Sequence, residues 1–402
     1  MKHQLTWMLG SALALACATT AEARTIVVAA GDDAQTRLQE ALINAEPGDV
    51  VRIGPGIFRL TDGLSLDVDG VTVRGAGAEE TILDFSAQQG AGEGLLVTSD
   101  DVVLRDFTVR DTRGDGIKSK NADRIVYLSL RVDWSGEPRT TNGAYGVYPV
   151  ESEYVLVDGV TVRGASDAGI YVGQSRHIIV RDSTAVQNVA GIEIENSYNA
   201  DVYDNLATGN TGGILIFDLP GLPQQGGHSV RVFDNIIVNN MTPNFAPAGN
   251  IVATVPAGSG VIVMANRDVE IFDNEFEGNG TSNIMITGYR YGATPAGYQP
   301  LPIRIRAMGN RHGRTGFQPG LPGGAEMARA FGGSLPPIMW DGAGSDIRIA
   351  DDVAALTLNL PDLNQPTSAA SPAPVDLSGE ANWPRVAAVV LPASMEAAAA
   401  AP

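Results

Sequence analysis

The stretch from Gly169 to Phe217 reads GIYVGQSRHIIVRDSTAVQNVAGIEIENSYNADVYDNLATGNTGGILIF and repeats itself every 22 residues. A small residue followed by an aliphatic one opens each repeat, at Ile170, Ile192 and Ile214. A unit of this length cannot bury a core of its own, so successive units must stack and share one. The stretch therefore predicts a solenoid.

The same two-residue step marks a column that runs through most of the chain. Its aliphatic members are Ile117, Val147, Ile170, Ile192, Ile214, Val261 and Ile284. A second column with the same period consists of Val102, Ile125, Val155, Ile178, Ala200, Val230 and Val269. Insertions at residues 134–144, 218–228 and 241–259 interrupt the period. Because long loops on a solenoid usually gather on one side, we expect these insertions to wall a groove.

The residues inside each unit alternate as strands do, not as helices. Ile192 and Ile194 point one way while Glu193 and Glu195 point the other. About three short strands per unit, with Gly and Asn at the corners, describe one coil of a parallel β-helix. The predicted fold class is therefore all-β, a single-stranded parallel β-helix whose coils stack about 4.8 Å apart.

A plug and two polar columns complete the predicted scaffold. Residues Asp33 to Ala45 place apolar side chains on one helical face, which predicts an N-terminal capping α-helix over the first coil. Polar residues also recur with the period, at Ser183, Asn205, Asn235 and Asn274 and at Asn188, Asn210, Asn240 and Asn279. Asparagine tolerates tight corners and bonds to neighbouring backbone, so we assign these columns to the scaffold.

The ends of the chain differ in composition from its middle. Residues 1–23 have a basic start, an apolar run and a small-residue cleavage pattern, which predicts a signal peptide and export to the periplasm or the medium. A lipoprotein acylated at Cys17 is the alternative. We expect the β-helix to span 24–362, the Pro/Ala-rich residues 363–402 to be disordered, and the mature chain to have no transmembrane segment.

Charge excludes one class of partner. The chain has 27 Lys and Arg against 46 Asp and Glu, a formal net charge of −19. A nucleic-acid binder needs a basic face that displaces counterions from phosphates, so we expect no nucleic-acid partner.

Several strings resemble known proteins. The phrase AEPGDVVRIGPGIFRL followed by GVTVRGAG is similar to the right-handed parallel β-helix superfamily of pectate lyases, polygalacturonases, alginate epimerases and phage tailspikes. More narrowly, GAYGVYPVES, SDAGIYVGQS, VAGIEIENS and GGILIFDLPGLPQQGG resemble exported bacterial β-helix proteins of unestablished function, over roughly Thr25 to Asp352. The resemblance implies a right-handed helix and, because such genes often adjoin one, a di-haem c-type cytochrome as partner.

The catalytic motifs of these enzymes do not carry over. Asp115 precedes Gly116-Ile117 as in polygalacturonases, but Tyr145 and Gly146 occupy the next coil and Gly-His-Gly is absent. The Asp-Pro-His-Asp string of the epimerases is missing too, as is the clustered aspartate of calcium-binding lyases. No His, Asp and Glu grouping has metal-ligand spacing. The sequence therefore predicts no metal site and no cofactor, with Ca²⁺ left open as an alternative.

The candidate site is the outward column beside the Gly–aliphatic ladder, called the outer strip below. Its first residues are Lys118, Tyr148, Tyr171, Glu193, Leu215, Ile262 and Met285. Its second residues are Lys120, Val150, Gly173, Glu195, Phe217, Met264 and Thr287. Aromatic rings stack on sugars, and lysines and carboxylates bond to hydroxyls. Two carboxylates about 6.6 Å apart at the Cα atoms also suit the acid–base pair of a glycosidase.

The predicted function is recognition of an extended carbohydrate, with lyase or hydrolase activity as an extension. Glu193 and Glu195 are the catalytic candidates. The substrate-binding candidates are Lys118, Lys120, Tyr148, Tyr171, Phe217, Asp218 and Trp134. One alternative is that the strip is ordinary solvated surface. The other is a non-catalytic partner or maturation module for an exported cytochrome or metalloprotein.

Overall fold

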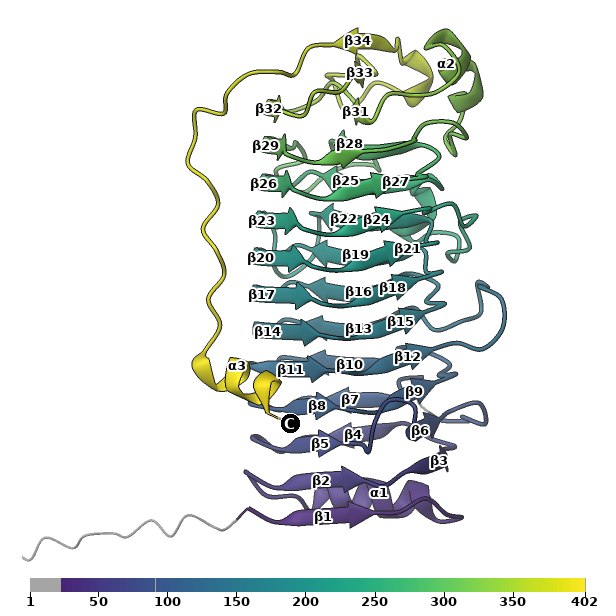
Figure 1. Ribbon diagram of the computed structural model, residues 1–402, viewed down its shortest axis with the longest axis vertical. Coiled ribbons are helices and arrows are strands. Elements are labelled where there is room, and N and C mark those ends of the chain that lie inside the picture. Colours follow the sequence, from purple (N-terminus) through teal and green to yellow (C-terminus); the bar gives the residue numbers. More distant parts are fainter. Residues whose placement is uncertain (1–22, 91, 402) are drawn as a thin grey trace, which may run out of the picture.

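The chain winds into a parallel β-helix in a computed structural model that describes residues 23–90 and 92–401 (Figure 1). Most coils contribute one strand to each of three sheets of parallel strands, named A, B and C here. Sheet A contains β1 (Thr25–Val28), β2 (Val50–Ile53), β5 (Thr72–Arg74), β8 (Val103–Arg105), β11 (Ile125–Leu128), β14 (Glu153–Asp158), β17 (Arg176–Arg181), β20 (Tyr198–Tyr203), β23 (His228–Phe233), β26 (Arg267–Phe272), β29 (Ile303–Met308) and β32 (Ser345–Ile349).

Sheets B and C form the other two walls of the helix. Sheet B contains β3 (Gly56–Arg59), β6 (Thr81–Asp84), β9 (Thr108–Arg110), β12 (Arg131–Asp133), β15 (Thr161–Arg163), β18 (Thr184–Val186), β21 (Leu206–Thr208), β24 (Ile236–Val238), β27 (Glu275–Glu277) and β30 (Arg311–His312). Sheet C contains β4 (Leu64–Leu66), β7 (Leu95–Val97), β10 (Ile117–Lys120), β13 (Tyr145–Val150), β16 (Ala168–Gly173), β19 (Ala190–Glu195), β22 (Gly212–Phe217), β25 (Ser259–Met264), β28 (Ser282–Thr287), β31 (Ile338–Trp340), β33 (Ala355–Thr357) and the antiparallel β34 (Ala373–Val375).

The predicted columns are stacked inward ladders. Ile192 lies opposite Ile170 on one side and Ile214 on the other, and all three side chains are fully buried. The second column stacks in the same way in sheet A, where Ala200 lies between Ile178 and Val230. These ladders join into one long apolar core, which confirms the fold class.

The asparagine columns bond from coil to coil inside the corners. Asn205 Nδ2 donates to Asn235 Oδ1 over 3.0 Å, and Asn235 Nδ2 donates to Asn274 Oδ1 over 2.9 Å. The second column does the same, with Asn210 Nδ2 donating to Asn240 Oδ1 over 3.0 Å. The bonds satisfy buried polar groups at the turns, so the assignment to the scaffold is confirmed.

Helix α1 (Ala34–Ile43) covers the first coil as predicted, with Leu38 and Leu42 buried against it. The remaining helical elements are α2 (Gly324–Ala330), α3 (Ala393–Ala400) and the short 3₁₀ turns η1 (Ile251–Thr254) and η2 (Thr367–Ala369). Within the part of the chain that the structure describes, no helix has the length and apolar character needed to cross a bilayer. Residues 1–22 of the expected signal peptide, Cys17 included, lie outside the described residues.

The C-terminal tail differs from the expected disorder. Its last segment descends along sheet A, at the left of Figure 1, and ends with α3 against β11. Leu391 and Met395 are buried there against apolar outer-face side chains of sheet A. Glu396 also pairs with Arg181, 2.9 Å apart. Composition alone predicted disorder because it takes no account of an apolar sheet face that needs a cover.

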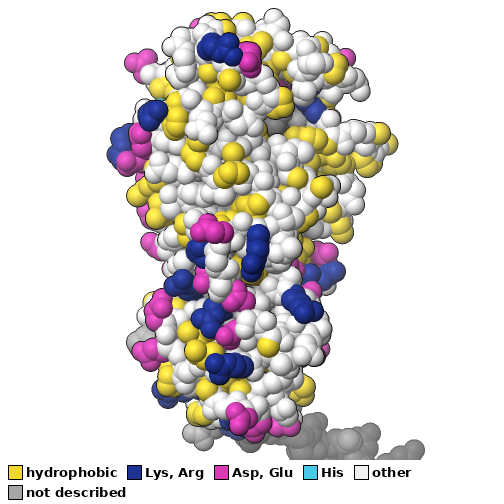
Figure 2. All heavy atoms as spheres, turned by 90° about the vertical axis from the view of Figure 1, so that its right-hand side faces the viewer, with side chains coloured by type: hydrophobic (Ala, Val, Ile, Leu, Met, Phe, Trp, Pro, Cys, Tyr) yellow, Lys and Arg dark blue, Asp and Glu magenta, His cyan; other side chains and the backbone are white. Residues whose placement is uncertain are grey.

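Opposite charges alternate on the face formed by sheet B. Figure 2 shows basic and acidic side chains interspersed over its lower half and mostly uncharged ones above. Arg110 pairs with Asp84 on the preceding coil, 2.7 Å apart, and Arg163 lies 3.5 Å from Asp133. Such pairs link neighbouring coils and leave no single-sign field on this face.

Candidate functional site

The register of sheet C brings the outer strip together as predicted. Lys118 on β10 lies opposite Tyr148 on β13, and Tyr171 on β16 lies opposite Glu193 on β19. Glu195 has Phe217 of β22 as its partner on the next coil. The strip continues through Ile262 on β25 to Met285 on β28, so it crosses seven consecutive coils on one sheet face.

Half of the strip is covered, contrary to the expectation of a solvent-facing surface. Tyr171, Glu193 and Phe217 are only 3%, 1% and 2% exposed. The third insertion folds back over them, and its Val252 and Val255 join the same apolar cluster. Residues 241–258 are called the lid loop below. A period fixes which way a side chain points but carries no information on which loop covers it.

The uncovered end contains the two lysines and Tyr148. Lys118 Nζ lies 3.4 Å from a carboxylate oxygen of Asp115 and 4.8 Å from the centre of the Tyr148 ring. Lys120, which is exposed, lies 3.8 Å from a carboxylate oxygen of Glu151. Both cations are neutralised within the chain, so this end presents a mixed polar and aromatic surface.

Three tyrosines join the uncovered end to the covered one. The ring centres of Tyr145 and Tyr148 are 4.4 Å apart, and that of Tyr171 lies 4.7 and 4.9 Å from them. The Tyr171 ring extends along its own strand over Gly173, where a Cβ atom would lie 2.3 Å from ring carbon Cε1. In this position the Tyr171 hydroxyl donates to Glu195 Oε1 over 2.5 Å. Glycine at 173 is thus what lets the ring reach the carboxylate.

Asp167, Glu193 and Glu195 form a buried group called the carboxyl cluster below. Neither side-chain oxygen of Glu193 has a hydrogen-bond partner, and burial raises its pKa well above the usual value. Burial also raises the pKa of Glu195 to about 7, although the Tyr171 hydrogen bond opposes that rise. The pKa of Asp167 rises to about 6 for the same reason. Burial thus raises the pKa of all three carboxyls, which is a property that general acids and bases in active sites share.

The lid loop is fastened directly to this cluster. Asn250 Nδ2 donates to Asp167 Oδ2 over 2.8 Å, and the Tyr145 hydroxyl donates to the same carboxylate. Inside the loop, Asn244 Nδ2 donates to the carbonyls of Val252 and Val255 over 2.8 and 3.0 Å. The loop is thus an internally bonded unit that reaches the cluster through the Asn250 side chain. Elsewhere it is held by apolar packing and by Thr242 and Thr254, whose hydroxyls donate to the Gly209 carbonyl and the Tyr291 hydroxyl.

Two predicted binding residues have structural positions instead. Asp218 is fully buried, and its Oδ1 accepts a bond of 2.7 Å from the Gly227 amide, which closes the loop between them. Burial raises the pKa of Asp218 to about 6. Trp134 is packed in the core and donates from Nε1 to the Thr112 carbonyl over 2.8 Å. The structure therefore places Trp134, a substrate-binding candidate, in the core and not on the strip.

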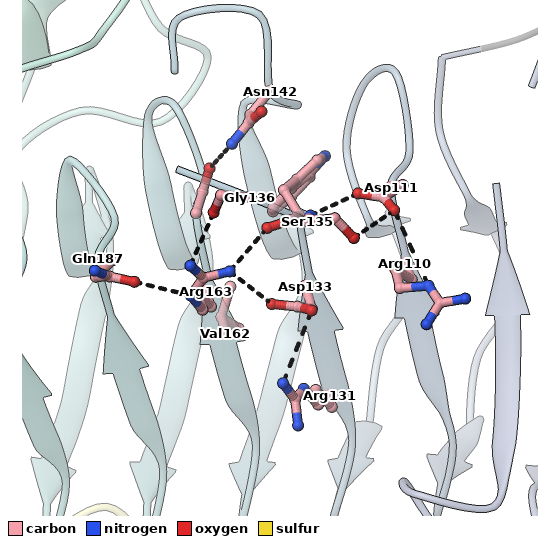
Figure 3. A network of polar contacts seen from close by, with 12 residues as sticks. Arg110, Asp111, Arg131, Asp133, Ser135, Gly136, Asn142, Val162, Arg163 and Gln187 are labelled. Carbon is pink, nitrogen blue, oxygen red and sulfur yellow. Dashed lines mark hydrogen bonds and ion pairs between the residues drawn. The ribbon is translucent and has the colours of Figure 1, made fainter. Parts of the chain in front are cut away.

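A polar network explains why the insertion after Trp134 stays away from the strip (Figure 3). The Ser135 amide donates to Asp111 Oδ1 over 2.6 Å. Arg163 donates to the Gly136 carbonyl over 2.8 Å and to Gln187 Oε1 over 2.8 Å. These bonds fasten the insertion to the corner beside sheet B.

Two hollows border the outer strip. A polar groove of about 390 Å³ is lined by Asn121, Asp123, Glu151, Ser152, Glu153, Gln174, Arg176, Pro223 and Gln224. It adjoins the uncovered end, because Glu151 pairs with Lys120. An apolar cavity of about 700 Å³ lies at the opposite end, beyond Phe217. The second insertion contributes Pro223 and Gln224 to the polar groove, and the third contributes residues 254–256 to the apolar cavity. The first insertion lines neither hollow, so the three insertions do not wall one common groove.

Metal ligands do not gather in the described ranges. Across residues 23–90 and 92–401, no group of three or more His, Cys, Asp or Glu side chains is arranged to hold a metal ion.

The fold is similar to that of known proteins. Residues 69–223 match the model of a family described as "Right handed beta helix region". The fold is a right-handed parallel β-helix. This β-helix is similar to the A-module of mannuronan C-5 epimerase AlgE4 from Azotobacter vinelandii, with a TM-score of 0.50, 15% identity and coverage of 81% of this chain and 94% of that one. The AlgE6 A-module from the same organism also has a TM-score of 0.50, with 17% identity and coverage of 79% and 90%. No curated protein sequence matches the chain.

Proposed function

We propose that this protein binds an extended carbohydrate along the outer strip and acts on it by acid–base chemistry in the carboxyl cluster. The observation that carries the proposal is continuity along one sheet face. A partly buried aromatic and polar surface at Tyr148 leads, coil by coil, to buried carboxyls, among them Glu195, whose pKa is raised to about 7. The two similar A-modules bear the name of a polysaccharide epimerase, which supports this class of substrate.

The roles of the residues follow from their surroundings. Glu193 is buried without a hydrogen-bond partner, and burial raises its pKa and favours its protonated form, so we assign it the role of proton donor. Glu195 titrates near pH 7 and serves as the base, with Tyr171 orienting it through their hydrogen bond. Such a pair suits either hydrolysis of a glycosidic bond or elimination across it.

Access to the cluster requires the lid loop to move. Opening breaks the Asn250–Asp167 bond and exposes the apolar patch beneath Val252 and Val255. Closure over bound sugar then excludes water from the carboxyls, as lids do in many enzymes. The polar groove beside Glu151 receives the part of the glycan that extends beyond the lid.

Export is part of the proposal and rests on the sequence of residues 1–23 alone. The alternative function is that of a partner for an exported cytochrome, and Lys118 and Lys120 are the basic side chains on the strip at which an acidic cytochrome would dock. Both lysines pair with acids of this chain, so the carbohydrate proposal is the one that the geometry favours.

The test separates binding from turnover. Purified mature chain is screened against neutral and uronate glycans, and products are assayed as new reducing ends for hydrolysis and as unsaturated sugars for elimination. Tyr148→Ala is expected to weaken glycan binding at least fivefold, the equivalent of about 1 kcal/mol of lost stacking. Glu195→Gln is expected to lower turnover about 100-fold with nearly normal binding.

Tyr203→Ala is the matched control, because it removes an aromatic ring from sheet A, away from the strip. Glycan affinity that is unchanged in Tyr148→Ala, or that falls equally in Tyr203→Ala, would show that the strip is ordinary surface.

A further inference from the structure

The apolar cavity beyond Phe217 is a second feature of the same sheet face. Its floor is formed by outward side chains of β25, β28 and β31, among them Ile262, Met264, Met285 and Met339. Its walls come from residues 254–256, 290–291, 321–327 and 358–370. These segments are far apart in sequence, so the chain builds an enclosure here from several loops.

The lining is apolar and adaptable. Four methionines contribute to it, namely Met264, Met285, Met327 and Met339. Methionine has three rotatable bonds and a polarizable sulfur, so a methionine-rich wall adjusts to apolar groups of differing shape. A cavity of about 700 Å³ lies within the range of small-molecule sites.

The charged groups at the cavity wall are already paired. Arg290 Nε donates to Asp341 Oδ2 over 2.9 Å, and the other guanidinium nitrogens donate to the carbonyls of Leu360 and Asp362. Asp341 also accepts bonds from Thr287 and the Gly288 amide. Because a charged ligand would find its counter-charges occupied, the complementary occupant is an uncharged apolar group.

The cavity is continuous with the strip. Phe217 lines the cavity, and its register partner on the preceding coil is Glu195. On the following coil its partner is Met264, which also lines the cavity. The apolar enclosure thus begins one coil, about 4.8 Å, from the carboxyl cluster. A single molecule on this face can reach both.

We propose that the cavity takes the apolar chain of an amphiphilic glycan, an alkyl or acyl chain attached to the sugar that lies on the strip. This inference rests on the proposed function and specifies its substrate class. The sugar occupies the Tyr148 end, the carboxyl cluster faces the linkage region, and the chain enters between the lid loop and α2.

The experiment measures affinity against chain length. Methyl, octyl and decyl β-glucosides, each below its micelle concentration, are titrated into the full-length mature protein by calorimetry. Each buried methylene should raise the affinity about fourfold, so decyl should bind about 15-fold more tightly than octyl. Met327→Glu, which places a charge at the cavity wall, should abolish this gain, whereas Met327→Leu should keep it. Leu321→Glu, at another point of the wall, repeats the test should Met327→Glu fail to fold.

The outcomes distinguish this inference from the proposed function. An affinity independent of chain length, or an equal gain in a folded Met327→Glu variant, overturns the cavity assignment. A second outcome also overturns the cavity assignment. In it, affinity rises with chain length but Tyr148→Ala leaves the affinity for alkyl glucosides unchanged, because the chain and the sugar would then bind separately. Loss of chain-free glycan binding in Tyr148→Ala is the independent measure of the proposed function. If affinity does not depend on chain length but Tyr148→Ala still weakens glycan binding, the cavity assignment is refuted and the proposed carbohydrate site is retained.

Discussion

Replacement of Glu195 by Gln should stabilise the protein increasingly as the pH rises. The carboxyl has an ordinary pKa of 4.5, which burial raises to about 7 in the folded chain. Between these values the folded state holds a proton that the unfolded state has released. Stability contributed by this group is therefore fully present below pH 4.5 and falls as the pH rises toward 7.

The size of the effect follows from that interval. Each pH unit corresponds to about 1.4 kcal/mol, so the loss between pH 4.5 and 7 amounts to about 3 kcal/mol for wild type. Glutamine keeps the shape and accepts the Tyr171 hydrogen bond through its amide oxygen, but it does not ionise. Glu195→Gln should thus resemble wild type near pH 4 and exceed it by about 3 kcal/mol near pH 8.

Urea unfolding followed by circular dichroism at pH 4, 5.5, 7 and 8 measures this difference. Glu137→Gln in the exposed insertion is the matched control and should show no pH-dependent gain. Salt-bridged groups also make the stability of the protein depend on pH. Arg24 holds the pKa of Asp49 well below its usual value, so the stability that this pair contributes is lost at low pH. The loss is the same in every variant and cancels when variants are compared. A difference between Glu195→Gln and wild type that stays constant from pH 4 to pH 8 would refute the account of the cluster.

Two further changes test the scaffold and the positioning of the site. Ile192→Asp buries an unpaired carboxyl in the core and should lower the free energy of unfolding in urea by several kcal/mol. Thr208→Asp, on the outer side of sheet B, is the control and should change it little. Equal stabilities of the two variants would contradict the assigned inward ladder. Gly173→Ala should displace the Tyr171 ring and remove its bond to Glu195, so the carboxyl pKa should rise further in a ¹³C-NMR titration. An unchanged titration would show that Gly173 has no positioning role.

The repeat made the scaffold predictable from the sequence. Stacking requires the same residue type at the same place in every coil. The 22-residue spacing of Ile170, Ile192 and Ile214 is therefore enough to predict that they stack. The helix over residues 34–43 was predictable for a related reason, because the first coil of a solenoid must be covered. The side chains of the outer strip were also placed on the correct face.

What covers that face was not predictable. The lid loop and the C-terminal tail obey no period, and their partners lie far away in the sequence, as Asn250 does from Asp167 and Glu396 from Arg181. The polar groove and the apolar cavity depend on these same loops. Burial of Glu193, and with it the shifted proton affinity of the site, therefore emerged only from the structure.

The fold itself does not require a carboxyl at position 193. The same column contains Leu215 on the next coil and Ile262 on the coil after it, and both pack under the inserted loops. An apolar residue at Glu193 would extend that packing and avoid the cost of an unpaired buried acid, which is several kcal/mol. A buried acid that lowers stability is expected at a functional site, where a carboxyl must keep its proton away from water. The cost therefore supports the proposal that acid–base chemistry takes place on the coil that bears Glu193 and Glu195, between the aromatic end of the strip and its apolar end.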